Sequence, residues 1–409
     1  MSVWRFRSFR EKRGERKRGF EPDMRAIRPR SVRTHLEPRR ISFKIRRMES
    51  ILFTPIRMGS VEIPNRFVRS ATHEFMAEDD GTPTDRHAEL FSRLAEGDVG
   101  LIITGHAYVQ PVGKASSRQT GIYDDRLVDA LGGIPAAVHR FPSKIFVQIA
   151  HAGRQTKESL AGGTPVAPSA VYDPVSKVMP RELSEEEIRR LIRDFAEAGR
   201  RARAAGFDGV QIHAAHGYLL SAFLSPYTNR RRDDWGGSTA GRVRVVVEII
   251  GALKAAAGDG YPVMAKWNST DFLPGGLEVG ESVEMAGRAV EAGLDGIEVS
   301  GGSAEAGRGS MWAGLRAEEE EGYFIDAAAK FKGAVPVPVI GLGGNRTFAV
   351  MERNVASGRV DMVSLSRPLI REPFLVREFR LGRIAKSACI SCNKCFNPRG
   401  ISCAELKKT

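Results

Sequence analysis

The chain has 409 residues, of which 42% are hydrophobic, and this suits one large α/β domain or two smaller ones. No apolar run approaches the ~18 residues of a membrane-spanning helix, so we expect none. The formal net charge is +13, but residues 1–47 hold 17 of the 62 Lys and Arg residues and only five of the 49 Asp and Glu residues. The remaining residues are therefore nearly neutral, and their charge indicates no nucleic-acid partner.

The basic N-terminal segment, residues 1–47, lacks the apolar stretch of a secretory signal. Its arginines suggest a transit peptide, but acidic residues such as Glu11 and Glu15 argue against one. Few of its residues could build a core, so we expect disorder. Two interpretations stay open. In the first, Met48 is the natural start and the segment is an upstream mistranslation of the reading frame. In the second, the segment is a genuine basic arm.

Residues 58–65 contain a Gly-Ser turn and predict a small hairpin that closes the bottom of the domain. Eight short apolar runs follow, and most are separated by segments with helical periodicity. Repeated strand–helix units predict a parallel sheet with helices outside, and eight units favour a TIM-type (β/α)8 barrel. No GxGxxG sequence follows the first run, which argues against a dinucleotide-binding open sheet. The runs are 67–71, 101–104, 145–149, 209–212, 263–266, 296–299, 337–342 and 362–365.

The clearest helix is predicted over residues 184–205. Ser184 and Glu187 have the spacing of a capping box at its start. One apolar face carries Ile188, Leu191, Ile192 and Phe195. Together these patterns predict a barrel over residues 48–385, followed by a cysteine-rich extension over residues 386–409.

Nearly every apolar run ends in a polar or glycine residue. The catalytic face of a (β/α)8 barrel lies at the carboxyl ends of its strands. Matching polar ends therefore suggest a shared mouth that holds one large ligand. These ends are Thr72 and His73, Gly105 and His106, Gln148, His213, Lys266, Gly301 and Gly302, Gly343 and Gly344, and Ser366 and Arg367.

The last two strand ends suggest a phosphate site. A Gly-Leu-Gly-Gly sequence ends at Gly344, and Ser366 precedes Arg367 at the end of the eighth run. Glycines let backbone N–H groups approach a phosphate, and arginine adds a charge-assisted hydrogen bond. The glycines alone would be more typical of a plain strand-to-helix turn. Their pairing with Arg367 favours phosphate binding, because the loops after strands seven and eight form the usual phosphate site of this architecture.

Two histidines and a tyrosine follow the fourth run. His213 and His216 could bind a metal, but no third ligand with suitable spacing follows. They could also be buried structural histidines. As a substrate site, two imidazole N–H donors could hold an oxygen that gains negative charge, and Tyr218 could protonate a carbon.

The surrounding sequence resembles the old yellow enzyme family of FMN-dependent NADH:flavin oxidoreductases. The pattern is HxxHGYLL from His213, then FLSP, then Asn229, Arg231, Asp233 and Trp-Gly-Gly, and the resemblance runs from about residue 52 to 403. It implies a barrel that binds FMN, with Gln148 on the flavin ring and Lys266 at the edge that becomes anionic on reduction. The expected FMN-binding residues are Ala71, Thr72, His73, Gly105, Gln148, Lys266, Gly343, Gly344, Ser366 and Arg367.

Three positions depart from this family's usual pattern. Members usually have Arg at the position of Lys266, Gly at that of Ser366, and often Cys or Thr at that of His73. Lysine is a point charge and cannot make arginine's forked contact. FMN binding is still expected, but redox potential and substrate preference stay open.

The resemblance implies a cycle in which NAD(P)H reduces FMN and the hydride then passes to the β-carbon of an alkene conjugated to a carbonyl. His213 and His216 would hold the carbonyl oxygen, and Tyr218 would protonate the α-carbon. A flavoprotein dehydrogenase or demethylase running in the oxidative direction is the alternative. A tRNA dihydrouridine synthase is disfavoured because the barrel region holds no cysteine, and a nucleic-acid role would need the basic segment to be translated.

All four cysteines lie in the extension, as Cys389, Cys392, Cys395 and Cys403. Disulfides are unexpected in a chain that otherwise suits the cytoplasm. The C-x2-C-x2-C start is ferredoxin-like, and larger members of the resembling family carry a [4Fe–4S] cluster just after the barrel, with different spacing. An iron–sulfur cluster, zinc and free thiols all stay open.

The expected partners are NAD(P)H and a small enone-like substrate, with no membrane and no nucleic acid. The sequence predicts neither a preference between NADH and NADPH nor an oligomeric state. Residues 110–125, 156–180 and 303–323 should shape the substrate pocket, and the last of these segments, rich in Gly and Glu, suits a mobile lid.

Overall fold

In the computed structural model, the structure describes residues 50–407 except residues 259 and 308. The chain divides into two units, Met1–Ile45 and Arg46–Thr409. The first unit lies wholly outside the described residues, and so do the predicted tail, residues 1–47, and the suggested start at Met48. The cysteine-rich extension, residues 386–409, falls within the second unit.

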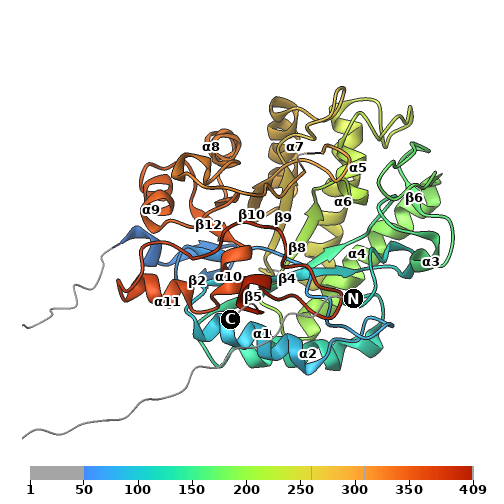
Figure 1. Cartoon of the computed structure of the whole chain (residues 1–409). Helices are drawn as coiled ribbons and strands as arrows, with labels where there is room; N and C mark the ends of the chain where they lie inside the picture. The colour runs from blue at the N-terminus through green and yellow to red at the C-terminus, as the bar shows by residue number, and fades with distance from the viewer. Residues whose placement is uncertain (1–49, 259, 308, 408–409) are drawn as a thin grey trace, which may run out of the picture. The chain divides into compact units, whose positions relative to one another are not determined.

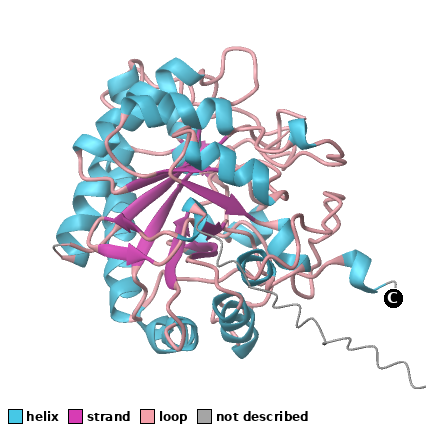
Figure 2. Ribbon diagram, turned by 90° about the vertical axis from the view of Figure 1, so that its left-hand side faces the viewer, coloured by secondary structure: helices cyan, strands magenta, loops and turns pink. Residues whose placement is uncertain are grey.

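Eight parallel strands close into a barrel, as the sequence predicts (Figures 1 and 2). Its strands pair in the order β3-β4-β5-β8-β9-β10-β11-β12, and β12 pairs with β3 to close the ring. Almost every strand residue is buried, because helices cover the outside and side chains fill the inside. The strands are β3 (Phe67–Arg69), β4 (Leu101–Tyr108), β5 (Lys144–Ala150), β8 (Gly209–Ala214), β9 (Val263–Asn268), β10 (Gly296–Ser300), β11 (Val339–Gly341) and β12 (Met362–Leu365).

The predicted hairpin plugs one end of this barrel. Strands β1 (Ile56–Met58) and β2 (Val61–Ile63) pair antiparallel, and Gly59 between them has a φ of +56°. Met58 and Ile63 belong to a buried cluster inside the barrel, together with side chains from six of its strands. Since this cluster fills the amino-terminal end, the carboxyl end is the one left for a ligand. The other members are Val68, Leu101, Ile103, Phe146, Met264, Ile340 and Met362.

Helices surround the barrel (Figure 2). The predicted capping box at Ser184 and Glu187 starts α4, and the predicted apolar face of that helix is buried. Two short strands, β6 (Val166–Ala167) and β7 (Arg181–Glu182), form a small separate sheet. The helices are α1 (Asp85–Glu96), α2 (Val128–Val138), α3 (Glu158–Ala161), α4 (Glu185–Ala204), α5 (Leu219–Leu224), α6 (Thr239–Ala257), α7 (Val279–Glu291), α8 (Ile325–Ala334), α9 (Phe348–Ala356), α10 (Arg367–Arg371) and α11 (Leu375–Arg380).

Strand boundaries differ from the predictions in two places. β4 continues to Tyr108, four residues beyond the predicted end, and its pairing with β5 shifts register between Ile103 and His106. β11 is only three residues long, because residues 337–338 and 342 of the predicted run lie outside the strand. Among the described residues, no helix is both long and apolar enough to cross a membrane.

Candidate active site

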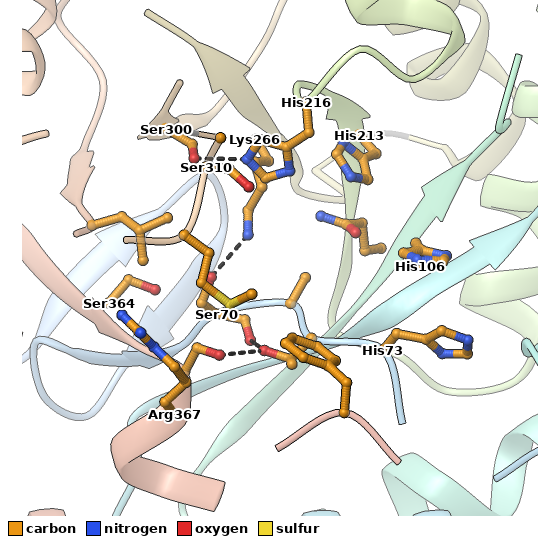
Figure 3. A pocket seen from close by; sticks show the side chains of 18 of the residues that line it. Ser70, His73, His106, His213, His216, Lys266, Ser300, Ser310, Ser364 and Arg367 are labelled. Atoms are coloured by element: carbon orange, nitrogen blue, oxygen red, sulfur yellow. Dashed lines mark hydrogen bonds between the residues drawn. The ribbon is translucent and has the colours of Figure 1, made fainter. Parts of the chain in front are cut away.

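A cavity of about 590 Å³ opens at the carboxyl ends of the barrel strands. That volume lies in the range of small-molecule and cofactor sites. Figure 3 shows His73, His106 and His213 along one side of the cavity and Arg367 on the other. The cavity wall includes Tyr218, His213 and His216, and eight of the ten predicted FMN-binding residues: Ala71, Thr72, His73, Gln148, Lys266, Gly344, Ser366 and Arg367.

The other two predicted FMN-binding residues, Gly105 and Gly343, do not line the cavity. The backbone N–H of Gly105 donates to the Glu74 carboxylate at 2.7 Å, so it is already engaged behind the wall. The carbonyl of Gly343 accepts hydrogen bonds from Gly322 and Tyr323, and a Cβ there would lie 2.9 Å from the Tyr323 nitrogen. In this structure both glycines allow close backbone packing around the site.

Lys266 sits in a buried polar network at the centre of the cavity (Figure 3). Its ammonium donates to the Ser70 hydroxyl at 2.8 Å and lies 3.3 Å from the Glu298 carboxylate. Burial lowers the pKa of Lys266, although Glu298 opposes that effect. Burial alone would raise the pKa of Glu298, but Lys266 and hydrogen bonds from Ser364, Ser70 and Gln211 outweigh it and hold that pKa below its usual value. The cation is therefore fixed in place and faces the cavity.

Gln148 is oriented by the same network. Its amide nitrogen donates to Gln211 at 2.6 Å, and Gln211 in turn donates to Glu298 at 2.9 Å. One N–H and the carbonyl oxygen of Gln148 are left for a ligand. This fits the predicted contact with the polar edge of a flavin ring.

The predicted phosphate end contains a buried cation without a carboxylate partner. Arg367 is 5% exposed, and its guanidinium donates to the Trp312 carbonyl at 2.8 Å and to the Asn393 side chain. Within the described part of the chain, no carboxylate forms a salt bridge with it. A buried charge needs compensation, so this end of the cavity favours an anionic ligand group. The cavity volume, Lys266, Gln148 and this cation together fit a bound FMN.

His213 and His216 face the cavity as neutral rings. Burial and the neighbouring histidine hold the pKa of His213 well below its usual value, and burial lowers that of His216 to about 3. The backbone N–H of Ala215 donates to Nδ1 of His213 at 3.4 Å, which leaves Nε2 as the N–H donor. Nε2 of His216 lies 2.7 Å from the Ser300 hydroxyl (Figure 3).

His216 has a left-handed backbone, with a φ of +63°. Its carbonyl accepts from Gln155 at 2.6 Å, and its N–H donates to Asn268 at 3.0 Å. Strained non-glycine conformations of this kind persist where the surroundings hold them in place, which is common at functional sites. The turn brings the two imidazole rings to 5.3 Å between centroids.

Tyr218 lies beside His213, with 4.7 Å between their ring centroids and the rings nearly edge to face. Burial raises the pKa of Tyr218 to about 12, so the phenol is protonated at neutral pH. Its hydroxyl is 3.5 Å from Nε2 of His106. A protonated phenol next to two neutral N–H donors suits proton donation beside a developing oxyanion.

Comparison with known proteins decides the family. The sequence model of the NADH:flavin oxidoreductase / NADH oxidase family matches residues 51–385. The chain belongs to this family. It is 38% identical to an NADH oxidase of Thermoanaerobacter brockii over 84% of this chain and 52% of that protein. It is 36% identical to an NADPH dehydrogenase of a Geobacillus species over 80% of this chain and 93% of that protein.

A solved structure supports the same conclusion. The old yellow enzyme homologue from Zymomonas mobilis superposes with a TM-score of 0.72 at 26% identity, over 87% of this chain and 97% of that one. The chain spans about half the length of two of the curated relatives it matches, at 52% and 53%. Membership of the NADH:flavin oxidoreductase family is what these comparisons show for this chain.

Replacing Gly344 with alanine is expected to reduce the FMN content of the purified protein. Gly344 has a φ of +75°, and a Cβ there would meet Leu315 and Tyr323. The backbone should shift away from the phosphate end, and the left-handed conformation alone should cost about 1–2 kcal/mol. Flavin absorbance per protein and urea unfolding measure the two effects.

The matched control is Gly358→Ala. Gly358 has a φ of +73°, but a Cβ there meets nothing within 4 Å, and the residue does not line the cavity. It should lose similar stability and keep its FMN. Full FMN retention in Gly344→Ala would contradict a role for this backbone in phosphate binding.

Sequence reasoning missed several residues of the site. His106 appears among the polar strand ends but was given no role, and its partner Gln119 lies in a loop without periodicity. Glu298 and Ser300 lie on β10, where only the glycines after the strand stood out. Residues of segments 110–125 and 303–323 line the cavity as predicted, whereas none of residues 156–180 does, and Phe396 of the extension lines it without having been predicted to. A period-two pattern with polar residues inside an apolar run could have indicated Glu298.

The four cysteines have free thiols, and three of them are buried. Burial raises the pKa of Cys395 to about 11, and neighbouring Cys389, Cys403 and Cys392 add to the rise, so the four side chains are close enough to interact. Yet no group of three or more His, Cys, Asp or Glu side chains among the described residues is arranged to hold a metal ion. The predicted metal site is therefore not formed in this conformation.

The extension packs against the mouth of the barrel. The backbone N–H of Ile401 donates to the Glu74 carbonyl at 2.8 Å, and Met76 contacts Cys395 and Ile401 in a small apolar cluster. Arg371 on α10 donates to the Cys403 sulfur at 3.7 Å. Phe396, which follows Cys395 in the sequence, lines the cavity, so the extension reaches the cavity wall.

Proposed function

We propose that this protein reduces a carbon–carbon double bond conjugated to a carbonyl, with NAD(P)H as the source of electrons. One observation carries the proposal: His213, His216 and Tyr218 face the same cavity that holds Lys266, Gln148 and the uncompensated charge of Arg367. Bound FMN would supply the hydride chemistry between NAD(P)H and the substrate. The residues of this chain supply the rest.

The two histidines bind the substrate carbonyl oxygen. Nε2 of His213 carries one N–H, because Nδ1 accepts from Ala215. Ser300 can donate to Nε2 of His216, so that Nδ1 of His216 carries the second N–H. Preorganised donors of this kind stabilise the negative charge that the oxygen gains when the β-carbon receives a hydride. Both imidazole rings are already uncharged at neutral pH, because both pKa values lie well below 7.

Tyr218 gives its phenolic proton to the α-carbon. The new C–H bond forms as the O–H bond breaks, and the phenolate regains a proton from water. Lys266, held by Ser70 and Glu298, places positive charge in the cavity, where it can favour an anionic flavin ring edge.

Steady-state turnover under nitrogen tests this function. NADH or NADPH would be mixed with 2-cyclohexenone and catalytic amounts of the full chain, and cyclohexanone would be measured by gas chromatography. Stoichiometric formation of cyclohexanone with one of the two reductants is expected. NAD(P)H oxidation that occurs only with oxygen, with no cyclohexanone, would overturn the proposed substrate class and would suit an oxidase or the oxidative direction.

We also propose that the cysteine segment binds a metal centre, with a [4Fe–4S] cluster as the favoured occupant. Its support is the C-x2-C-x2-C spacing, the mutual interaction of the four thiols, and two nearby cations. Arg371 contacts Cys403, and burial raises the pKa of Cys389 while the nearby charge of Arg367 opposes that rise. Since the side chains form no ligand set here, the proposal requires them to rearrange on binding, and no catalytic step is assigned to the centre.

Iron, zinc and acid-labile sulfide should be measured on protein purified without oxygen. About four iron and four sulfide per chain are expected for this cluster. One zinc without sulfide would replace the cluster by a zinc site, and the absence of all three would leave free thiols. A Cys392→Ser variant should lose the iron but keep the FMN, since Cys392 does not line the cavity. A cytoplasmic location and the absence of a nucleic-acid partner stay predictions.

A further inference from the structure

His106 lies at the end of β4 and faces the cavity next to Tyr218, yet the proposed mechanism gives it no role. The pairing of β4 with β5 shifts register between Ile103 and His106. Inside this irregularity, the N–H of Gly105 donates to Glu74. Bulges of this kind re-aim side chains next to active sites. Here the shift places the His106 ring 5.4 Å from the Tyr218 ring, between centroids.

The surroundings of His106 fix which ring nitrogen carries the proton. Oε1 of Gln119 accepts the backbone N–H of Ala115 at 2.7 Å, so the amide nitrogen of Gln119 must point the other way. That nitrogen donates to the His106 carbonyl at 3.0 Å and lies 2.6 Å from Nδ1 of the ring. Nδ1 is therefore an acceptor, and a neutral His106 carries its proton on Nε2, the nitrogen 3.5 Å from the Tyr218 hydroxyl.

His106 stays neutral near pH 7. Burial, assisted by the charge of Lys266, lowers its pKa to about 4, although Glu74 opposes this shift. His73 and His213 also face it, at centroid distances of 5.0 and 6.2 Å, and burial holds the pKa values of both well below their usual range. The cluster therefore adds no positive charge beside the phenol.

The position next to Tyr218 matters because a buried phenolate is costly. Burial raises the pKa of Tyr218 to about 12, so loss of its proton to a substrate carbon leaves an unfavourable charge. An N–H donor aimed at that oxygen would offset the cost, because hydrogen bonds to ionised acceptors are stronger than neutral ones. A distance between donor and acceptor at the long end of the hydrogen-bond range is common in active sites without substrate. Such a distance shortens in the reacting complex.

We infer that His106 is a positioning residue for Tyr218: its Nε2–H donates to the phenol oxygen, leaves the phenolic hydrogen free to face the substrate, and stabilises the phenolate after proton transfer. Gln119 holds His106 in the required tautomer. No proton leaves His106 in the cycle. The inference rests on the proposed reduction of an enone and adds a second residue to its acid step.

A double-mutant cycle tests the inference. His106→Leu removes the donor, and His106→Gln keeps an N–H. Each is made alone and together with Tyr218→Phe. The reduced enzyme is mixed anaerobically with 2-cyclohexenone in a stopped-flow instrument. His106→Leu should slow flavin reoxidation roughly tenfold or more, as expected for loss of a charge-assisted hydrogen bond. In the Tyr218→Phe background the same change should matter less than about twofold, because there is no phenol to assist.

Two readouts separate positioning from a purely structural role. FMN content and the rate of flavin reduction by NAD(P)H should be unchanged in His106→Leu, and His106→Gln should recover part of the lost rate. A slowdown of equal size with and without Tyr218, or equal slowing of both half-reactions, would overturn the inference. Wild-type enzyme that cannot be reoxidised by the enone would instead refute the proposed function itself.

Gln119→Glu provides a second variant with a distinct signature. A carboxylate at this position would accept a proton from Nδ1, which reverses the tautomer of neutral His106 and raises its pKa. Only the cationic ring would then donate to Tyr218. The reoxidation rate should fall as pH rises through the new pKa of His106, whereas the wild-type rate should stay flat over the same range. A flat profile in Gln119→Glu would show that the tautomer does not matter.

Discussion

Replacing Tyr218 with phenylalanine should slow the reoxidation of reduced flavin by an enone about 1,000-fold, because a positioned general acid typically contributes 10²–10⁴ in rate. The ring would keep its contacts with His213 and His106, so the change removes only the hydroxyl. Flavin reduction by NAD(P)H needs no proton at this position and should keep its rate. Anaerobic stopped-flow absorbance of the flavin measures both steps on the same protein.

The pH dependence gives an independent check on Tyr218. Because burial raises its pKa to about 12, the donor is protonated at every lower pH. The wild-type reoxidation rate should therefore show no loss as pH rises from about 6 to about 10, and should fall only as pH approaches that pKa. A loss of rate around neutral pH would assign the proton to another group. Poor FMN binding by Tyr218→Phe would indicate a structural role instead.

Replacing His213 with alanine should raise the barrier of the same step by roughly 3 kcal/mol, which slows reoxidation about a hundredfold. The reason is the loss of one of two N–H donors to the substrate oxygen. Nε2 of His213 is the protonated nitrogen, since Nδ1 accepts the N–H of Ala215. Stopped-flow reoxidation across a range of enone concentrations separates weaker binding from a slower chemical step.

His213→Asn is the matched control, because its amide retains an N–H donor of similar reach. It should lose clearly less rate than His213→Ala. The neutral state of His213 also predicts that the ratio between wild type and variant stays constant from about pH 6 to pH 9, since the pKa of the ring lies well below that window. Equal slowing of both half-reactions would contradict the assignment of His213 to the substrate oxygen.

The barrel could be predicted from the sequence because its signals are local. Each barrel strand is a short apolar run. The start of a helix such as α4 is marked by its capping residues, Ser184 and Glu187. The strand ends could be aligned on one face by the geometry of the fold alone. The length of β4 could not be predicted, because the register shift near His106 involves pairing with β5 and a hydrogen bond that Gly105 donates to the distant Glu74.

The residues that face the substrate could be predicted from the sequence, but most of the residues that hold them could not. His213, His216 and Tyr218 stand close together in sequence, and all three reach the cavity. The groups that hold the site come from distant segments. Ser300, which ends β10, and Gln155, which follows β5, contact His216, and Gln119, which lies before α2, holds the neighbouring His106. Which nitrogen of a histidine carries a proton depends on these partners, so no sequence pattern could show it.

The predicted role of Arg367 was extended by the structure. The sequence suggested only a phosphate contact, but the guanidinium also donates to Asn393 and to the Trp312 carbonyl. It therefore joins the predicted lid, the cysteine-rich extension and the cavity in one buried group. Phe396 of the extension lines the same cavity, so changes in the extension should be felt at the flavin.

The most direct test of the central claim is an anaerobic titration of the FMN-loaded full chain. NADH or NADPH is added until the flavin absorbance bleaches, and 2-cyclohexenone is then added without oxygen. We predict bleaching by at least one reductant and full recovery of flavin absorbance with one equivalent of enone. Recovery only after oxygen is admitted would contradict the claim that the two histidines and the tyrosine serve the reduction of a conjugated alkene.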